Sequence, residues 1–226
     1  MDGVSNEMDF RYYALAHHDD LRQFRPDRVN LMKYPEAITD RLIGRCSYRH
    51  DPIVRGCIFA DGAFLWSELS SIISLDKRDR AIFEGGAREG LNEGITVPYC
   101  PLSGFMGSCT FAGMKRPERA SRFLGIVQMI GSFGFQAARR LIEGPLPVAP
   151  VGPRLQPRTR DCIILVGRGY SNKEIARALS ITPRTVDGYL TEARRLFDAH
   201  DRTELVVCAV LAGEVGLYEL RRRQPE

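Results

Sequence analysis

The chain has 226 residues, of which 44% are hydrophobic, so it can build two modest domains or one large one. Its net charge of +4 permits nucleic-acid binding without arguing strongly for it. No apolar stretch reaches the roughly 18 residues of a membrane span, and the first ten residues lack the features of a secretory signal. None of the six cysteines forms a C-x-x-C pair, so we expect a cytoplasmic protein with reduced thiols, no metal and no cofactor.

Hydrophobic periodicity predicts a mixture of helices and strands in the first part of the chain. We expect helices over residues 9–24, 36–43, 77–90 and 117–143, and strands near 28–32, 95–98 and 105–112. Residues 64–69 fit either a strand end or a helix start. Alternation along 105–112 places Ser108 and Thr110 on one face of their strand.

A proline-rich segment divides the chain. Prolines at positions 145, 147, 150 and 153 forbid a helix and favour an extended spacer. We therefore predict a first domain over residues 1–144, a linker over 145–153 and a second domain over 154–226. Residues 151–226 hold 13 Lys or Arg and 10 Asp or Glu, so most of the positive excess lies there.

Two short helices joined by a tight turn are predicted over residues 170–197, after a helix at 157–166. Ser171 and Glu174 form a capping box for the first of the pair. Thr182 followed by Pro183 caps the second. This is the layout of a helix-turn-helix, whose second helix enters the major groove of DNA. An ordinary small helical bundle is the alternative.

The strings G-x-S-N-K-E-I-A, I-T-x-x-T-V and R-T-E-L succeed one another here, and together they resemble the DNA-binding domain of LuxR-type transcription regulators. The resemblance implies an all-α four-helix domain, with a last helix that we expect Thr203 to cap. It also implies contacts with double-stranded DNA from Lys173, Arg184, Thr185, Asp187, Gly188, Thr191, Arg194 and Arg195.

The base-facing positions of the second helix, usually basic in that family, are Asp187, Gly188 and Thr191. Asp187 can accept a hydrogen bond from cytosine N4, and Thr191 can contact a thymine methyl group. The nearby lysine and arginines either contact phosphates or form an ordinary solvated face.

The first domain resembles the acyl-homoserine-lactone-binding domain of quorum-sensing LuxR-type regulators. Tyr34-Pro35, Asp51-Pro52, Trp66-Ser67-Glu68 and Gly94 carry the resemblance by their order and spacing. It implies an α/β/α sandwich with an antiparallel sheet, hence an α+β chain overall.

The same resemblance assigns roles in ligand binding. Asp51 accepts from the amide N–H of the ligand, Tyr34 donates to the amide carbonyl, and Trp66 forms an aromatic wall. Ser108 and Thr110 place hydroxyls near the head group or the acyl chain. The alternatives are that Asp51 caps a turn before Pro52 and that Trp66 belongs to the core.

Two positions depart from the family. Ile38 replaces a tryptophan whose indole N–H donates to the lactone carbonyl, and Leu42 replaces a tyrosine. Ile38 has no hydrogen-bond donor. Either the ligand is not a standard acyl-homoserine lactone, or it sits differently, or the domain needs none.

The sequence thus predicts a homodimeric, ligand-responsive transcription regulator, not an enzyme, with a small-molecule autoinducer as partner. We expect the last helix, near Val206, Val210 and Leu211, to form part of the dimer interface. A regulator that is ligand-independent or that forms heterodimers is one alternative. A response regulator, with Asp19, Asp20, Asp51 and Lys115 as its phosphoacceptor cluster, is another.

Overall fold

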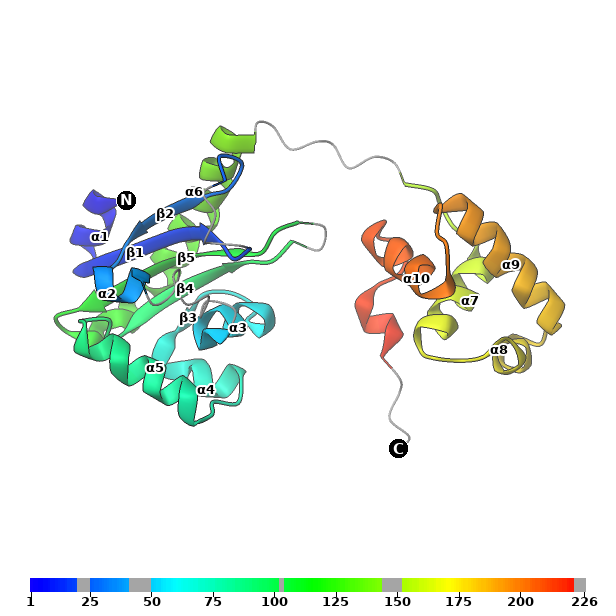
Figure 1. Ribbon diagram of the computed structural model, residues 1–226, viewed down its shortest axis with the longest axis horizontal. Coiled ribbons are helices and arrows are strands. Elements are labelled where there is room, and N and C mark those ends of the chain that lie inside the picture. Colours follow the sequence, from blue (N-terminus) through cyan, green and yellow to red (C-terminus); the bar gives the residue numbers. More distant parts are fainter. Residues whose placement is uncertain (20–24, 41–49, 102–103, 144–151, 222–226) are drawn as a thin grey trace. The chain divides into compact units, whose positions relative to one another are not determined.

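The computed structural model describes residues 1–19, 25–40, 50–101, 104–143 and 152–221 (Figure 1). The chain divides into two compact units, Met1–Leu146 and Pro147–Glu226. The predicted limits of the linker stay predictions, because residues 144–151 lie outside the described ranges. Among the described helices, none combines the length and apolar character needed to cross a membrane.

An antiparallel sheet forms the centre of the first unit. Its described strands are β1 (Phe10–His17), β2 (Asn30–Lys33), β3 (Phe64–Leu65), β4 (Gly94–Tyr99) and β5 (Gly107–Met114), in the order β2-β1-β5-β4-β3. All neighbouring strands pair antiparallel. This topology confirms the predicted α+β class and is incompatible with the doubly wound parallel sheet of a phosphoacceptor domain.

The long helix α6 (Leu124–Glu143) covers one face of the sheet, together with the 3₁₀ segment η4 (Pro117–Phe123) and the short helix α1 (Asp2–Glu7) (Figure 1). Phe10, Phe111, Val127 and Phe135 are among the fully buried side chains between these layers. Gly131 permits the close approach of α6, because a Cβ there would lie 2.6 Å from Val97.

Shorter elements cover the other face of the sheet and build the pocket described below. They are α2 (Glu36–Thr39), α3 (Pro52–Phe59), η3 (Trp66–Glu68), α4 (Leu69–Ile72) and α5 (Lys77–Arg88). Strand alternation points Ala14 and Ala16 of β1 and Ser108 and Thr110 of β5 toward this face.

The helix predicted over residues 9–24 is wrong: β1 occupies Phe10–His17, after α1. Tyr13 and Leu15 face the α6 core, while Ala14 and Ala16 face the pocket. A strand buried on both faces reads as a continuous apolar run, and such a run shows no period of two.

Four α-helices make up most of the described part of the second unit: α7 (Pro157–Gly167), α8 (Asn172–Leu179), α9 (Pro183–Leu196) and α10 (Arg202–Leu211). A 3₁₀ turn, η5 (Leu217–Leu220), follows. The predicted capping box of Ser171 and Glu174 is confirmed, and Thr182 caps α9 by accepting from the Thr185 amide at 3.1 Å. The cap predicted at Thr203 is wrong, because Asp201 accepts from the Thr203 and Glu204 amides instead.

Candidate functional site

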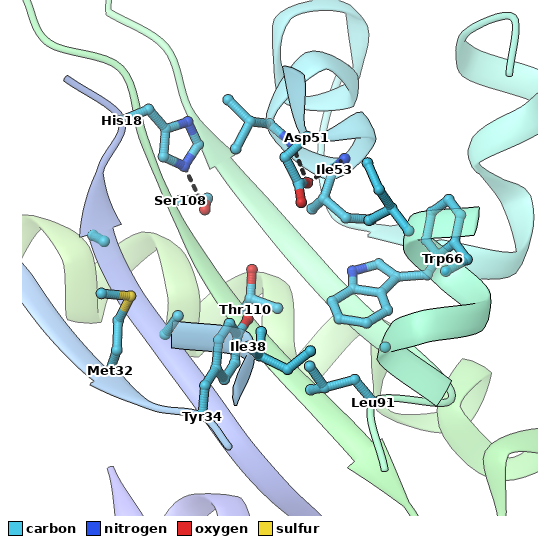
Figure 2. Close-up of a pocket in the computed structure, with 16 residues that line it drawn as sticks. His18, Met32, Tyr34, Ile38, Asp51, Ile53, Trp66, Leu91, Ser108 and Thr110 are labelled. Carbon is cyan, nitrogen blue, oxygen red and sulfur yellow. Dashed lines mark hydrogen bonds between the residues drawn. The ribbon is translucent and has the colours of Figure 1, made fainter. Parts of the chain in front are cut away.

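A cavity of about 110 Å³ lies between the sheet and helices α3 and α5 (Figure 2). Its lining is mostly apolar, with a few polar groups, as is usual for sites that bind small organic molecules. Six of the seven predicted ligand-binding residues line it: Tyr34, Ile38, Asp51, Trp66, Ser108 and Thr110. The seventh, Leu42, lies outside the described residues.

A chain of hydrogen bonds crosses the floor of the pocket. Trp66 donates its indole N–H to Thr96 Oγ1 at 2.9 Å, and the Thr96 and Thr110 hydroxyls pair at 2.9 Å. Gly94 makes room for the indole, because a Cβ there would lie 2.6 Å from the ring. Sequence reasoning assigned no role to Thr96, although a part-buried indole N–H usually has a nearby acceptor.

Tyr34 presents a protonated hydroxyl to the pocket. Burial raises the pKa of this phenol well above its usual range, and the charge of Asp51 raises it further, whereas a hydrogen bond with Thr110 acts in the opposite direction. The hydroxyl therefore keeps its proton at neutral pH and remains a hydrogen-bond donor.

Asp51 both borders the pocket and caps α3. Its Oδ1 accepts from the Ile53 amide at 2.8 Å and from the Val54 amide at 3.4 Å. The capping role considered from the sequence is thus confirmed, and the role toward a ligand stays a prediction. The two roles are compatible, because an ionised carboxylate has two oxygens and about four acceptor positions.

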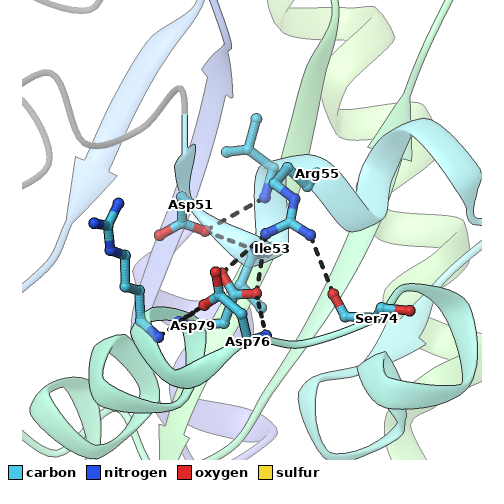
Figure 3. A network of polar contacts seen from close by, with 8 residues as sticks. Asp51, Ile53, Arg55, Ser74, Asp76 and Asp79 are labelled. Carbon is cyan, nitrogen blue, oxygen red and sulfur yellow. Dashed lines mark hydrogen bonds and ion pairs between the residues drawn. The ribbon is translucent and has the colours of Figure 1, made fainter.

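An ion pair joins α3, whose N-cap residue is Asp51, to α5 (Figure 3). Arg55 Nη1 lies 2.9 Å and 3.0 Å from the two carboxylate oxygens of Asp79, whose side chain is 3% exposed. Arg55 also donates to the Ser74 carbonyl at 3.2 Å. Asp79 closes a capping box with Asp76 at the start of α5. These contacts fix α3, and with it the carboxylate of Asp51, against the neighbouring helix.

The two ends of the pocket differ in polarity. At one end Ile38, Leu91 and Ala112 form an apolar cluster against Tyr34 and Trp66. At the other, His18 Nε2 lies 2.9 Å from Ser108 Oγ. The helix predicted over residues 9–24 would have carried His17 and His18; instead, His17 is buried at the end of β1, and His18 lines the pocket. If residues 10–17 had been predicted as the strand β1, its register would have predicted the position of His18.

The predicted DNA-contacting residues lie on α8 and α9, and their exposure varies. Five are exposed: Lys173, Arg184, Asp187, Gly188 and Arg195. Thr185, Thr191 and Arg194 are half-buried. Thr185 pairs with Thr182, and Arg194 donates to Thr191 Oγ1 at 3.2 Å. A Cβ at Gly188 would meet nothing within 4 Å, so packing within the unit does not require this glycine.

The predicted dimer surface on α10 needs a correction. Val210 is 6% exposed and belongs to the core of the second unit, with Leu205 and Ala209. Val207 and Leu211 are 51% and 49% exposed, and their four-residue spacing puts them side by side on the outer face of the helix. The apolar surface of α10 is therefore centred on Val207 and Leu211.

Comparison with known proteins finds one family match in each of the two units. Residues 1–138 match the family described as the autoinducer binding domain, and residues 154–209 match the bacterial regulatory proteins of the luxR family. The chain is 30% identical to the transcriptional activator protein BjaR1 of Bradyrhizobium diazoefficiens, over 72% of this chain and 65% of that protein. It is 26% identical to the putative HTH-type transcriptional regulator y4qH of Sinorhizobium fredii, over 90% of this chain and 61% of that protein.

The chain thus spans less than two thirds of the length of these two relatives. A crystal structure of Escherichia coli SdiA superposes with a TM-score of 0.50 at 19% identity, covering 94% of this chain and 88% of that one. At this identity the superposition supports the shared fold alone.

Proposed function

The chain belongs to the LuxR family of bacterial regulatory proteins, and we propose that it is a dimeric, sequence-specific transcription regulator controlled by a small amide-bearing molecule. The observation that carries the proposal is the grouping of Tyr34, Asp51 and Trp66 around one cavity, in a chain that also exposes Arg184 and Asp187 on a helix-turn-helix. The family is one of DNA-binding regulators and not of enzymes. A regulator of this kind acts in the cytoplasm, where it meets the DNA.

The pocket chemistry favours an amide. Tyr34 offers a donor, and Asp51 offers a charged acceptor. A secondary amide supplies the matching carbonyl and N–H, and hydrogen bonds to a charged partner are the stronger kind. The apolar walls around these two groups suit an acyl or aryl substituent.

The apolar end of the pocket argues against a standard homoserine lactone as the preferred head group. Ile38, 3% exposed, packs with Leu91 and Ala112 there, and none of the three side chains can donate to a ring carbonyl. An unpaired buried carbonyl costs about 1–3 kcal/mol, which corresponds to roughly ten- to a hundredfold in affinity. We therefore expect ordinary acyl-homoserine lactones to bind weakly.

Calorimetric titration of the full chain with acyl-homoserine lactones tests this proposal. Ile38→Trp supplies the missing indole N–H and is expected to raise lactone affinity about tenfold or more. Tyr34→Phe removes the donor to the amide and is expected to lower affinity for every amide ligand. Ile58→Trp, at an exposed position of α3, is the matched control and should change neither. Nanomolar binding of an ordinary lactone by the unmodified protein would contradict the argument from Ile38.

A further inference from the structure

Thr96 belongs to the hydrogen-bond chain under the pocket, yet its own side chain does not line the cavity. It lies on β4 and is fully buried. Among the described residues its hydroxyl has two hydrogen-bond partners, the indole N–H of Trp66 and the hydroxyl of Thr110, each at 2.9 Å. Both partners line the cavity, so Thr96 can act on a ligand through them.

The indole fixes the direction of this chain. An indole N–H only donates, so the Thr96 oxygen accepts from Trp66. The Thr96 proton then needs an acceptor, because a buried donor without one is costly. Within the described part of the chain, Thr110 Oγ1 is the acceptor that Thr96 reaches. Thr96 therefore donates to Thr110, and the Thr110 oxygen accepts.

Thr110 carries the same direction on to the amide-reading end of the site. Because its oxygen accepts from Thr96, its own proton points to another acceptor, and Tyr34 lies beside it (Figure 2). Burial and the charge of Asp51 raise the pKa of the Tyr34 phenol, and a hydrogen bond with Thr110 lowers it, which is the effect of a donating Thr110. The Tyr34 oxygen thus accepts from Thr110, and its proton is left for the ligand.

We propose that Thr96 is a positioning residue for ligand recognition, which orients the Thr110 and Tyr34 hydroxyls so that the site presents a donor and selects a strong acceptor oxygen. Without the Thr96 hydroxyl, Thr110 is free to reverse, and Tyr34 can donate to Thr110 instead of to the ligand. Hydrogen bonds in a chain also strengthen one another, so the loss of one is felt at the next. This inference rests on the proposed function, since it assumes that an amide-bearing ligand occupies the cavity.

The test is calorimetry of the full chain with octanoyl-homoserine lactone and with its thioamide analogue, in which sulfur replaces the amide oxygen. Sulfur is a weak acceptor, so the unmodified protein should bind the amide about tenfold more tightly than the thioamide. Thr96→Val keeps the shape of the side chain without the hydroxyl, and it should reduce this preference about threefold or more. Thr96→Ser keeps the hydroxyl and should retain the preference.

Ser5→Ala is the matched control for a lost buried hydroxyl. Ser5 is buried in α1, on the α6 side of the sheet, and its hydroxyl donates to the Phe10 carbonyl at 2.8 Å. Its loss should lower the free energy of unfolding but leave the ratio of the two affinities unchanged. A general loosening of the first unit would weaken the binding of both probes alike, so the ratio reports the orientation of the hydroxyls.

The outcomes separate this inference from the proposed function. If both probes bind in a Tyr34-dependent way, and the preference is absent in the unmodified protein or unchanged in Thr96→Val, the inference falls while amide sensing stands. A preference lost equally in Thr96→Ser overturns it as well. If neither probe binds, or if binding does not depend on Tyr34, lactone sensing falls, and this inference falls with it. Should Thr96→Val fail to fold, Thr96→Ala removes the same hydroxyl with less bulk and carries the same expectation.

Discussion

Trp66 and Thr96 are joined by a hydrogen bond of 2.9 Å from the indole Nε1 to the threonine Oγ1, and this bond orients the aromatic wall of the pocket. Thr96 lies directly opposite Thr110 in the pairing of β4 with β5, and the two hydroxyls are bonded to each other. The indole N–H is thus engaged by the sheet, so Trp66 offers a ligand its ring surface and not its donor.

Thr96→Val should destabilise the first unit while keeping the shape of the side chain. The change leaves the indole N–H without its acceptor, which costs about 1–3 kcal/mol in the free energy of unfolding. Urea denaturation measures it. In a Trp66→Phe background the same change should cost much less, because the donor is gone. An equal cost in both backgrounds would mean that the hydroxyl acts through Thr110 alone.

Substitutions at Asp51 should separate its two roles. Asn caps helices about as well as Asp, so Asp51→Asn is expected to keep the free energy of unfolding, whereas Asp51→Ala should lose about 0.5–2 kcal/mol. Both variants should bind amide ligands at least about tenfold more weakly, because the charged acceptor is lost. Calorimetry measures the ligand affinity, and urea denaturation measures the free energy of unfolding. Asp61→Asn, at an exposed carboxylate, is the control. Wild-type affinity in Asp51→Asn would leave capping as the only role.

The pH dependence of stability should carry the signature of His18. Burial lowers its folded-state pKa from the ordinary 6.5 to about 4, so between these values the unfolded chain binds a proton that the folded chain does not. The contribution of the neutral His18 to the free energy of unfolding is therefore fully present above pH 6.5, and it is lost as the pH falls from 6.5 toward about 4. Between neutral pH and pH 5, the free energy of unfolding of the wild type should fall by about 1–2 kcal/mol more than that of His18→Asn. Urea denaturation at the two pH values measures both changes. His200→Asn, at an exposed histidine, should behave as the wild type does.

Local chemistry made the second unit more predictable than the first. The capping box of Ser171 and Glu174 and the helix start at Thr182-Pro183 depend on residues at most three positions apart in the sequence, and both were confirmed. β1 was missed because its burial on both faces depends on β5 and α6, which lie about a hundred residues away in sequence. The position of His18 in the pocket was missed for the same reason, since it depends on strand register and on a neighbour in β5.

The sequence likewise predicted some residues of the candidate site and missed others. The order of Tyr34, Asp51 and Trp66 in the sequence anticipated residues that the structure brings together around one cavity. Thr96 was not anticipated, because a threonine in a strand has no local feature that marks it as a partner of a tryptophan thirty residues earlier. Val210 was assigned to the dimer surface although it packs in the core of the second unit, because the sequence alone does not show which face of α10 the neighbouring helices cover.

Asp187 and Arg195 are expected to affect DNA binding in different ways. Both are exposed on α9. Asp187→Ala should relax preference at one base position by about 1–3 kcal/mol, read from selection out of random DNA. Arg195→Ala should weaken binding to all sequences and reduce the slope of log affinity against log salt by about one unit. An unchanged motif in Asp187→Ala would show that this carboxylate points away from the bases.

Dimerisation should depend on the outer face of α10. Val207 and Leu211 expose apolar surface there, and a dimer would remove it from water. Val207→Gln and Leu211→Gln add no charge, so they leave the phosphate electrostatics unchanged; combined, they should shift sedimentation toward monomer and weaken operator binding, because each recognition helix reads one half-site. Leu217→Gln, at a leucine of η5 that is 61% exposed, is the matched control and should remain dimeric. Val210→Gln should instead lower the free energy of unfolding, because it buries an amide in the core. A double variant that stays dimeric and binds its operator normally would move the interface away from α10.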